Sequence, residues 1–290
     1  MSPAEAWTIR RVVAWATDDL RSRGSSSPRL DVELLLGLVL KLDRVQLIVD
    51  ADRPLSKDEL AAYRALHRRR RAGEPVAYLR GVREFYGRNF RVDARVLVPR
   101  PETEILVETA LRRTRALSLS ARVLDLCTGS GCVAITLARE RPTTRVVAVD
   151  LSEGALVVAR ENATRLGVTH QIALLRSDLY AALDPGARFD LITANPPYIS
   201  ELEIPSLPPD VRDFEPRLAL AGGEDGLAVV RRVVLGARSF LAPGGVLALE
   251  VGAGQAPEVQ ALFEQGGFTA IERQRDYAGH ERVVSGQSSG

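Results

Sequence analysis

The spacing of apolar residues divides the 290-residue chain into two parts. In the first part, three segments carry apolar residues at helical spacing: 5–23, 30–41 and 57–71. Ser56 stands where the N-cap of the third helix is expected. From 76 to 98 the pattern changes to short extended pieces around residues 86–89, which is typical of a hairpin. We therefore predict a helical domain over 1–75 and a linking hairpin over 76–98.

Short apolar strands alternate with helical segments after Pro101, a residue that suits the first turn of a helix. The predicted strands are 123–126, 146–149, 172–175, 191–194 and 246–251. This alternation predicts an α/β domain over 99–290, with a doubly wound, mostly parallel sheet that binds ligands at the carboxyl ends of its strands. Residues 268–274 and 281–284 can pair as an antiparallel edge, and 285–290 is expected to be a loose tail.

Composition excludes several classes of protein. Hydrophobic residues make up 46% of the chain and charged residues 26%, which is typical of a globular chain that buries a core. The longest apolar stretch, 34–40, is far shorter than the ~20 residues that cross a bilayer. Glu5 and Trp7 stand where a signal peptide needs a basic start and an apolar run, so we expect a cytoplasmic protein with no membrane partner. Cys127, Cys132 and the three histidines have no metal-ligand spacing, so we expect no disulfide and no metal.

A glycine-rich turn follows the first predicted strand. The run from 123 to 131, VLDLCTGSG, leaves a strand and opens a helix at Cys132. Gly129 and Gly131 allow the backbone to approach a ligand closely, because neither carries a Cβ. The run also fits the loose pattern of dinucleotide-binding loops, and a plain tight turn is the alternative without a ligand.

Carboxylates stand at the ends of successive predicted strands. Asp150 ends the second strand, where it can accept hydrogen bonds from both ribose hydroxyls of a cofactor. Asp178 follows the third strand, where its carboxylate can accept a hydrogen bond from the amino group of an adenine. Asp125, near the end of the first strand, would repel a pyrophosphate and suits the cationic methionine end of S-adenosylmethionine. We therefore predict a methyl donor rather than NAD, although each aspartate taken singly is also an ordinary strand-end or N-cap residue.

The run Asn195, Pro196, Pro197 and Tyr198 follows the fourth predicted strand. Its prolines stiffen the loop and lack N–H donors. The Asn195 side-chain oxygen and the Pro196 carbonyl can accept the two hydrogens of a planar NH2 group. Those bonds direct the nitrogen lone pair at the methyl of a sulfonium and strengthen toward the transition state. Tyr198 supplies a flat face for a planar amide or base, and a rigid turn is the structural alternative.

These motifs resemble those of the release-factor glutamine methyltransferase family over nearly the whole chain. The similar runs are 30–35, 74–78 together with Gly81, 98–104, 125–131, 195–198, 214–217, 223–226 and 278–283. The resemblance implies a class I S-adenosylmethionine-dependent fold and methylation of the glutamine in the GGQ loop of peptide-chain release factors. The helical domain is then expected to dock the release factor.

The resemblance also assigns roles to single residues. The cofactor site that it implies comprises Asp125, Cys127, Thr128, Gly129, Ser130, Gly131, Asp150, Asp178, Leu179 and Asn195. Residues 195–198 would hold the target amide and carry the catalysis, and Leu97 and Arg100 would face the target pocket. The family usually has glycine where Cys127 stands, and cysteine is small enough to keep the assignment.

Two other functions compete with this interpretation. A nucleic-acid methyltransferase that acts on adenine amino groups uses the same Asn-Pro-Pro-Tyr chemistry, but a net charge of +2 predicts no basic binding face. A non-catalytic scaffold can keep the fold, but the intact run 195–198 and the carboxylates at 125 and 150 argue against it. We expect no direct nucleic-acid partner and a monomer, and the sequence does not determine which release factors are accepted.

Overall fold

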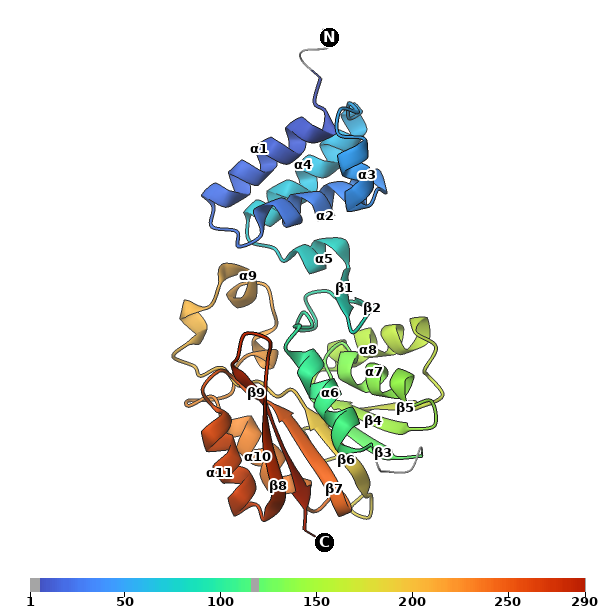
Figure 1. Ribbon diagram of the computed structural model, residues 1–290, viewed down its shortest axis with the longest axis vertical. Coiled ribbons are helices and arrows are strands. Elements are labelled where there is room, and N and C mark those ends of the chain that lie inside the picture. The colour runs from blue at the N-terminus through green and yellow to red at the C-terminus, as the bar shows by residue number, and fades with distance from the viewer. Residues whose placement is uncertain (1–5, 116–119, 290) are drawn as a thin grey trace. The chain divides into compact units, whose positions relative to one another are not determined.

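The computed structural model describes residues 6–115 and 120–289, and the chain divides into two units (Figure 1). The first unit contains Met1–Gly81 and Pro209–Phe214. The second contains Val82–Pro208 and Glu215–Gly290. Among the described residues, no helix is both long and apolar enough to cross a membrane.

The first unit is built from helices. They are α1 (Ile9–Ser22), α2 (Pro28–Leu40), α3 (Arg44–Val49), α4 (Lys57–Arg71), α5 (Val76–Arg80) and α9 (Pro209–Arg212). Helices α1, α2 and α4 share a core that includes Leu20, Leu35 and Tyr63. The Ser56 side chain accepts a hydrogen bond from the Glu59 backbone N–H, which confirms the predicted N-cap of α4.

Three sequence predictions are wrong in detail in this unit. Helix α1 begins at Ile9 rather than at residue 5, which lies outside the described residues, because Thr8 caps the helix. Helix α3 was missed because six residues are too few to show a periodic pattern. Residues 76–80 were expected to be extended but form α5, which ends at Gly81 in the left-handed conformation (φ 68°).

The second unit is organised around a mostly parallel sheet. Within the described residues, seven strands form it in the order β5-β4-β3-β6-β7-β9-β8. They are β3 (Arg122–Leu126), β4 (Arg145–Asp150), β5 (Ile172–Arg176), β6 (Phe189–Ala194), β7 (Leu241–Glu250), β8 (Phe268–Arg275) and β9 (Glu281–Ser288). Strands β3 to β7 run parallel, whereas β9 is antiparallel to both β7 and β8. The predicted parallel sheet and its antiparallel edge are confirmed.

Two strands extend several residues beyond their predicted ends. Strand β7 begins at Leu241 rather than at residue 246. Residues 285–288, which were expected in a loose tail, belong to β9, where Ser285 pairs with Ala248 of β7 and Glu272 of β8. The small polar side chains of this segment give no apolar signal, yet its backbone groups complete the ladders on both sides.

A hairpin of β1 (Val82–Phe85) and β2 (Arg88–Arg91) precedes the sheet, as predicted. Tyr86 and Gly87 connect the strands with positive φ angles of 51° and 69°, as in a type I′ turn. Asn162 of α8 (Glu153–Arg165) accepts a hydrogen bond from the Arg91 N–H at 2.7 Å and donates one to the Ser130 carbonyl at 2.9 Å. The fully buried Asn162 side chain therefore ties the hairpin to the glycine-rich turn.

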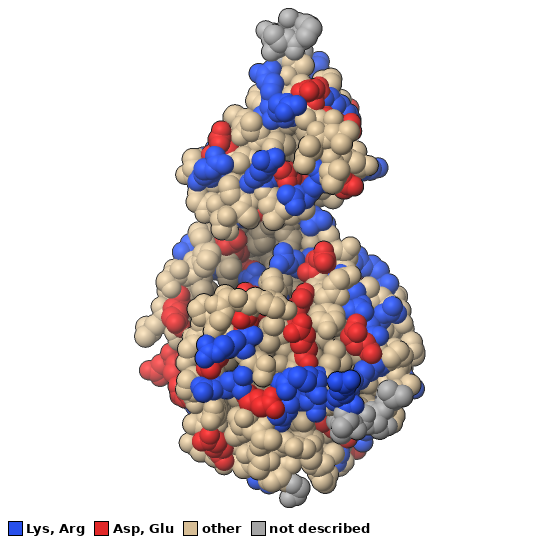
Figure 2. Space-filling model, in the orientation of Figure 1, with Lys and Arg blue, Asp and Glu red and all other residues tan. Residues whose placement is uncertain are grey.

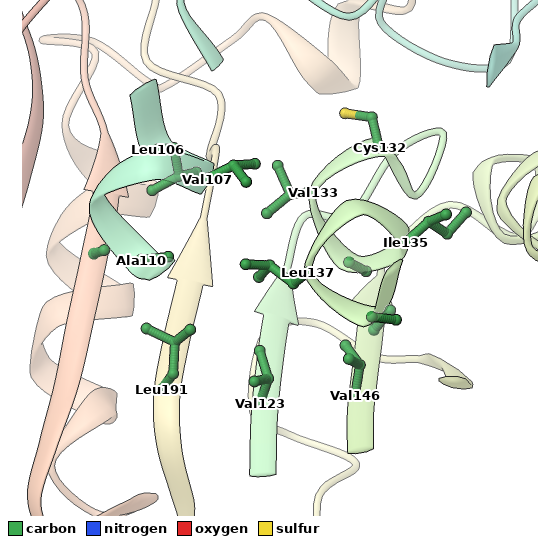
Figure 3. Packing of buried hydrophobic residues seen from close by; sticks show 14 of the residues in the cluster. Leu106, Val107, Ala110, Val123, Cys132, Val133, Ile135, Leu137, Val146 and Leu191 are labelled. Atoms are coloured by element: carbon green, nitrogen blue, oxygen red, sulfur yellow. The ribbon is translucent and has the colours of Figure 1, made fainter. Parts of the chain in front are cut away.

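Helices cover both faces of the sheet. Helices α6 (Thr103–Arg113) and α7 (Cys132–Glu140) pack on one face, where Leu106 and Leu137 meet Val123 and Leu191 of the strands (Figure 3). The other face is covered by α10 (Ala228–Ala237) and α11 (Ala256–Gln265). Short 3-10 helices, η2 (Ile204–Ser206) and η3 (Arg217–Ala219), lie between β6 and α10 along the chain. Because β3, β4 and β6 are parallel neighbours, the loops after their carboxyl ends meet at one edge.

Candidate active site

A cavity of about 320 Å³ lies at this edge of the second unit. Its walls come from the loops after β3, β4, β5 and β6 and from the segment that precedes α6. The predicted site residues that line it are Leu97, Arg100, Asp125, Cys127, Thr128, Gly129, Ser130, Asp150, Asp178, Leu179, Asn195 and Pro197. Gly131, Pro196 and Tyr198 are not among the lining residues.

Gly129 and Gly131 serve different purposes in the glycine-rich turn. A Cβ built on Gly129 meets no atom within 4 Å, so this backbone borders open space in the cavity. A Cβ on Gly131, whose φ is +80°, would lie 2.9 Å from Cδ1 of Ile135 and 3.3 Å from Cβ of Ala159. The turn therefore needs Gly131 for packing between α7 and α8, and Gly129 keeps the ligand side clear.

Cys127 lies in the left-handed region, with φ 57°. A residue with a Cβ costs about 1–2 kcal/mol there, which explains why glycine suits this position in the family that the sequence resembles. The neighbouring Thr128 N–H donates to the Val149 carbonyl at 3.0 Å and holds the turn against β4. Burial, with smaller contributions from Asp150 and Asp125, raises the pKa of the Cys127 thiol far above its usual value. The thiol therefore stays neutral and is no nucleophile.

Asp125 is buried beneath the turn, with 1% of its surface exposed. Its carboxylate accepts hydrogen bonds from the hydroxyls of Thr128 at 2.6 Å and Thr193 at 2.7 Å. Burial raises its pKa to about 6, although both hydroxyls favour the ionised form. Asp125 thus braces the loop and places negative charge at the cavity wall.

Asp150 fixes the turn from the neighbouring strand. Its carboxylate accepts from the Gly129 N–H and from the Ser152 N–H, both at 2.8 Å. Burial raises its pKa, and the backbone hydrogen bonds partly offset that rise. Each carboxylate oxygen keeps a further lone pair for a ligand.

Asp178 and Leu179 form the wall after β5. The Asp178 carboxylate forms an ion pair with Arg232 of α10 at 2.8 Å, and about half of each side chain is exposed. Leu179 is buried and has φ 52°, a conformation that costs energy for a residue with a Cβ and is found at ligand sites. Sequence reasoning missed Arg232, because only the tertiary structure brings α10 to this wall.

The loop 195–198 follows β6. Asn195 Nδ2 donates a hydrogen bond to Thr103 Oγ1 at 3.2 Å, so its Oδ1 is the end that can accept a hydrogen bond from a ligand. The Tyr198 hydroxyl donates to Oε1 of the buried Glu250 at 3.3 Å, and its carbonyl accepts from Gln255 Nε2 at 2.9 Å. Asn195 thus faces the cavity, whereas Tyr198 anchors the loop to β7 and to Gln255, the N-cap residue of α11.

Arg100 reaches the cavity from the segment before α6. Its Nη2 forms an ion pair with Glu215 Oε1 at 2.7 Å, and Glu215 Oε2 accepts from the Val98 N–H at 3.2 Å. The Glu215 side chain is 1% exposed, whereas that of Arg100 is 32% exposed. The buried carboxylate therefore fixes Arg100 at the mouth of the cavity. Sequence reasoning missed Glu215, although it stands within one of the family-like runs, 214–217.

The sheet carries a glycine-rich turn after β3, a carboxylate at the end of β4 and Asn-Pro-Pro-Tyr after β6, which together define a class I methyltransferase. Residues 11–81 match the family described as the PrmC N-terminal domain, and residues 101–206 match the methyltransferase small domain. The release factor glutamine methyltransferase of Geobacter sulfurreducens is 44% identical over 283 residues, which cover 98% of this chain and 98% of that protein. The enzyme of the same name from Burkholderia pseudomallei is 47% identical over 272 residues, which cover 92% of this chain and 95% of that protein. The chain belongs to the release factor glutamine methyltransferase family, as its motifs indicated.

Solved structures of other methyltransferases share the fold. A methyltransferase from Pyrococcus furiosus has a TM-score of 0.54 at 18% identity, covering 71% of this chain and 91% of that one. The 16S rRNA N2 G1207 methyltransferase of T. Thermophilus, solved with AdoMet and guanosine, has a TM-score of 0.52 at 21% identity, covering 71% of this chain and 49% of that one. These likenesses confirm the predicted fold class.

Proposed function

We propose that the chain transfers a methyl group from S-adenosylmethionine to the side-chain amide nitrogen of the glutamine in the GGQ loop of peptide-chain release factors. Membership of the family supports the reaction, and the names of the relatives support the substrate. The observation that carries the proposal is the Asn195 amide at the cavity wall, which is held by Thr103 with its oxygen as the available acceptor.

The cavity fits the proposed cofactor. Its volume lies within the range of small-molecule sites, and a Cβ on Gly129 would enter space that is open in the structure. We assign Asp150 to the ribose hydroxyls, Asp178 and Leu179 to the adenine, and Asp125 to the methionine end. S-adenosylmethionine supplies an electrophilic methyl group on a sulfonium. The carboxylates at 125 and 150 match a ligand that carries positive charge and hydroxyl donors.

We assign Asn195 the role of a hydrogen-bond acceptor for the NH2 group of the target glutamine. An amide nitrogen is a poor nucleophile because its lone pair is delocalised into the carbonyl. Oδ1 of Asn195 and the main-chain carbonyl of Pro196 would accept the two amide hydrogens and localise the lone pair on nitrogen. The nitrogen becomes more positive as the new bond forms, so these hydrogen bonds strengthen toward the transition state. The product can lose its proton to water, and no side-chain base is required.

The mouth of the cavity suits a residue presented on a loop. Leu97 offers an apolar wall, and Arg100, held by Glu215, offers donors to backbone carbonyls of an incoming chain. We further propose that the helices of residues 1–75 bind the body of the release factor. Two separated contacts on one substrate raise the effective concentration of its GGQ loop at the site.

Surface charge favours a protein substrate over nucleic acid. On the face shown in Figure 2, basic and acidic side chains are interspersed. Many arginines form ion pairs; Arg112 and Arg113, for example, both bind Glu272, at 2.7 and 2.6 Å. Nucleic-acid enzymes of this chemistry need a continuous basic surface for the phosphates.

Parallel assays with a tritiated methyl donor test the proposed substrate. Release factor, a short GGQ peptide, total RNA and unmethylated DNA are each incubated with the full chain. We expect efficient labelling of the release factor and none of either nucleic acid. Labelling of RNA or DNA without labelling of the release factor would overturn the proposal.

A further inference from the structure

Residues 223–226 are a family-like run to which neither the cofactor site nor the proposed chemistry gives a role. The run packs against the loop 195–198. A Cβ built on Gly226, whose φ is +78°, would lie 2.5 Å from the carbonyl oxygen of Tyr198 and 2.9 Å from Nε2 of Gln255. Gly226 is buried. Glycine is needed at this position because the loop backbone and the glutamine amide occupy the place of a side chain.

Gln255, the N-cap residue of α11, holds the Tyr198 carbonyl through its side chain. Its Nε2 donates to the Tyr198 carbonyl oxygen at 2.9 Å, and its Oε1 accepts from the Gly252 N–H at 2.8 Å. A backbone N–H can only donate and a backbone carbonyl can only accept, so these two bonds allow one orientation of the Gln255 amide. Its NH2 group is therefore directed at the loop.

The same peptide unit is held from its other side. The Tyr198 carbonyl and the Ile199 N–H belong to one planar trans unit and point in opposite directions. The Ile199 N–H donates to the Leu220 carbonyl at 3.0 Å, and the Ile199 carbonyl in turn accepts from the Gly222 N–H at 2.8 Å. Gln255 and Leu220 therefore fix one peptide unit at both of its polar ends.

We propose that Gln255, packed against Gly226, is a positioning residue that holds the loop 195–198 in the geometry required for methyl transfer. The inference rests on the proposed function, in which Asn195 Oδ1 and the Pro196 carbonyl accept the two hydrogens of the target amide. The two proline rings fix the φ angles within the loop, so a displacement at its far end shifts both acceptors. Gln255 is not among the residues that line the cavity, and it acts on the reaction through the loop.

The variant Gln255→Glu tests this role. It keeps the acceptor for the Gly252 N–H, removes the donor and places an ionised carboxylate against the Tyr198 carbonyl. It should lower kcat on the release factor about 10- to 100-fold, the effect of a lost hydrogen bond together with displaced acceptors. The KM for the release factor and the calorimetric Kd for S-adenosylmethionine should stay within about twofold of the parental values, because neither depends on this bond.

Gln260→Glu is the matched control. It makes the same chemical change on α11, where the Gln260 amide donates to Glu264 at 2.8 Å. This variant should keep the parental kcat. A loss of kcat as large as that of Gln255→Glu would show that any added charge on α11 slows the enzyme, and would overturn the inference.

Gly226→Ala reaches the same carbonyl by a second route, since its methyl group would displace Tyr198. Gly223→Ala is its control: Gly223 has a φ of +92°, so the backbone strain is similar, but its Cβ would meet Cβ of Ala228 at 2.8 Å. Gly226→Ala should lower kcat without loss of cofactor affinity. Gly223→Ala should lower the free energy of unfolding in urea and keep kcat. This pair decides the question if Gln255→Glu does not fold by circular dichroism.

A double-mutant cycle links Gln255 to the acceptors. In an Asn195→Ala background, Gln255→Glu should cause a smaller loss of kcat, because one of the two acceptors is already absent. Equal losses in both backgrounds, parental kcat in Gln255→Glu, or a loss of cofactor affinity as large as the loss of kcat would overturn the inference. Failure of the proposed function is a different result: the parent protein does not methylate the release factor, or Asn195→Ala alone turns over at the parental rate.

Discussion

Replacement of Asp150 by alanine probes the proposed cofactor site. Its carboxylate already accepts hydrogen bonds from the Gly129 and Ser152 N–H groups at 2.8 Å, and one lone pair on each oxygen remains for a ribose hydroxyl. Hydrogen bonds to a charged group contribute ~1.5–3 kcal/mol each, and water replaces part of what is lost. Asp150→Ala should therefore weaken S-adenosylmethionine binding by ~2–4 kcal/mol, a factor of roughly 30 to 1000.

Isothermal titration calorimetry measures this loss directly. Asp178→Ala is the matched control, because that carboxylate is half exposed and forms an ion pair with Arg232. We expect it to lose only ~1 kcal/mol, the contribution of one hydrogen bond near solvent. Unchanged affinity in Asp150→Ala, or tighter binding of NAD than of S-adenosylmethionine by the parent protein, would refute the assignment.

The same site should respond to pH. Burial raises the pKa of Asp150, and the ionised carboxylate is the acceptor for the ribose. Affinity should therefore fall as the pH falls through this raised pKa, at a higher pH than for an exposed aspartate. Asp150→Ala should reduce that dependence, and the part that remains should follow Asp125, whose pKa burial raises to about 6.

Three further predictions concern catalysis, stability and substrate binding. Asn195→Ala should lower kcat ~100-fold, by analogy with the loss of one oxyanion-hole donor, while calorimetry shows little change in cofactor affinity; near-parental turnover would make the loop purely structural. The folded-state pKa of Asp125 is raised from 3.8 to about 6, so the free energy of unfolding should fall as the pH rises through this window. The fall should amount to up to ~3 kcal/mol, as measured by urea unfolding, and Asp125→Asn should abolish it. An identical pH profile in both proteins would show that Asp125 does not cause the fall. A short GGQ peptide should show a much higher KM than the intact release factor in steady-state assays, because it lacks the remote contacts, and equal KM values would argue against docking by residues 1–75.

The part of the site that lies at strand ends could be predicted from the sequence. Asp125, Asp150 and Asn195 each stand at or just beyond a short apolar run, and parallel strands bring their carboxyl ends to one edge whatever the details of packing. The hairpin was equally local, since Tyr86 and Gly87 interrupt two extended runs. The sequence pattern alone predicts these residues because their positions depend only on the order of strands and loops along the chain.

The remaining residues could not be found in this way. Thr103, Glu215, Arg232 and Glu250 act through partners far away in the sequence: Glu215 binds Arg100 across 115 positions, and Arg232 binds Asp178 across 54. No periodicity or motif spacing reports such pairs, because helix packing on the sheet sets them. The strand at 285–288 was missed for a related reason, since neighbouring strands on both sides, rather than its own side chains, stabilise it.

The sequence around helix α5 contains a helix signal in its terminal residues, although the apolar pattern gives none. Pro75 precedes it and Gly81 ends it, which is the usual order of proline and glycine around a helix. Five residues give too short an apolar pattern to outweigh the neighbouring extended segment. The terminal residues were thus more informative than the periodicity.

Mass spectrometry of release factors from cells with and without this chain tests the central claim most directly. The GGQ peptide should carry one additional methyl group on the glutamine side chain when the chain is present. The modification should be absent without the chain and nearly absent when only the Asn195→Ala variant is supplied. Full methylation in cells that lack the chain and any other enzyme of this family, or methyl transfer found only on nucleic acid, would contradict the proposed function.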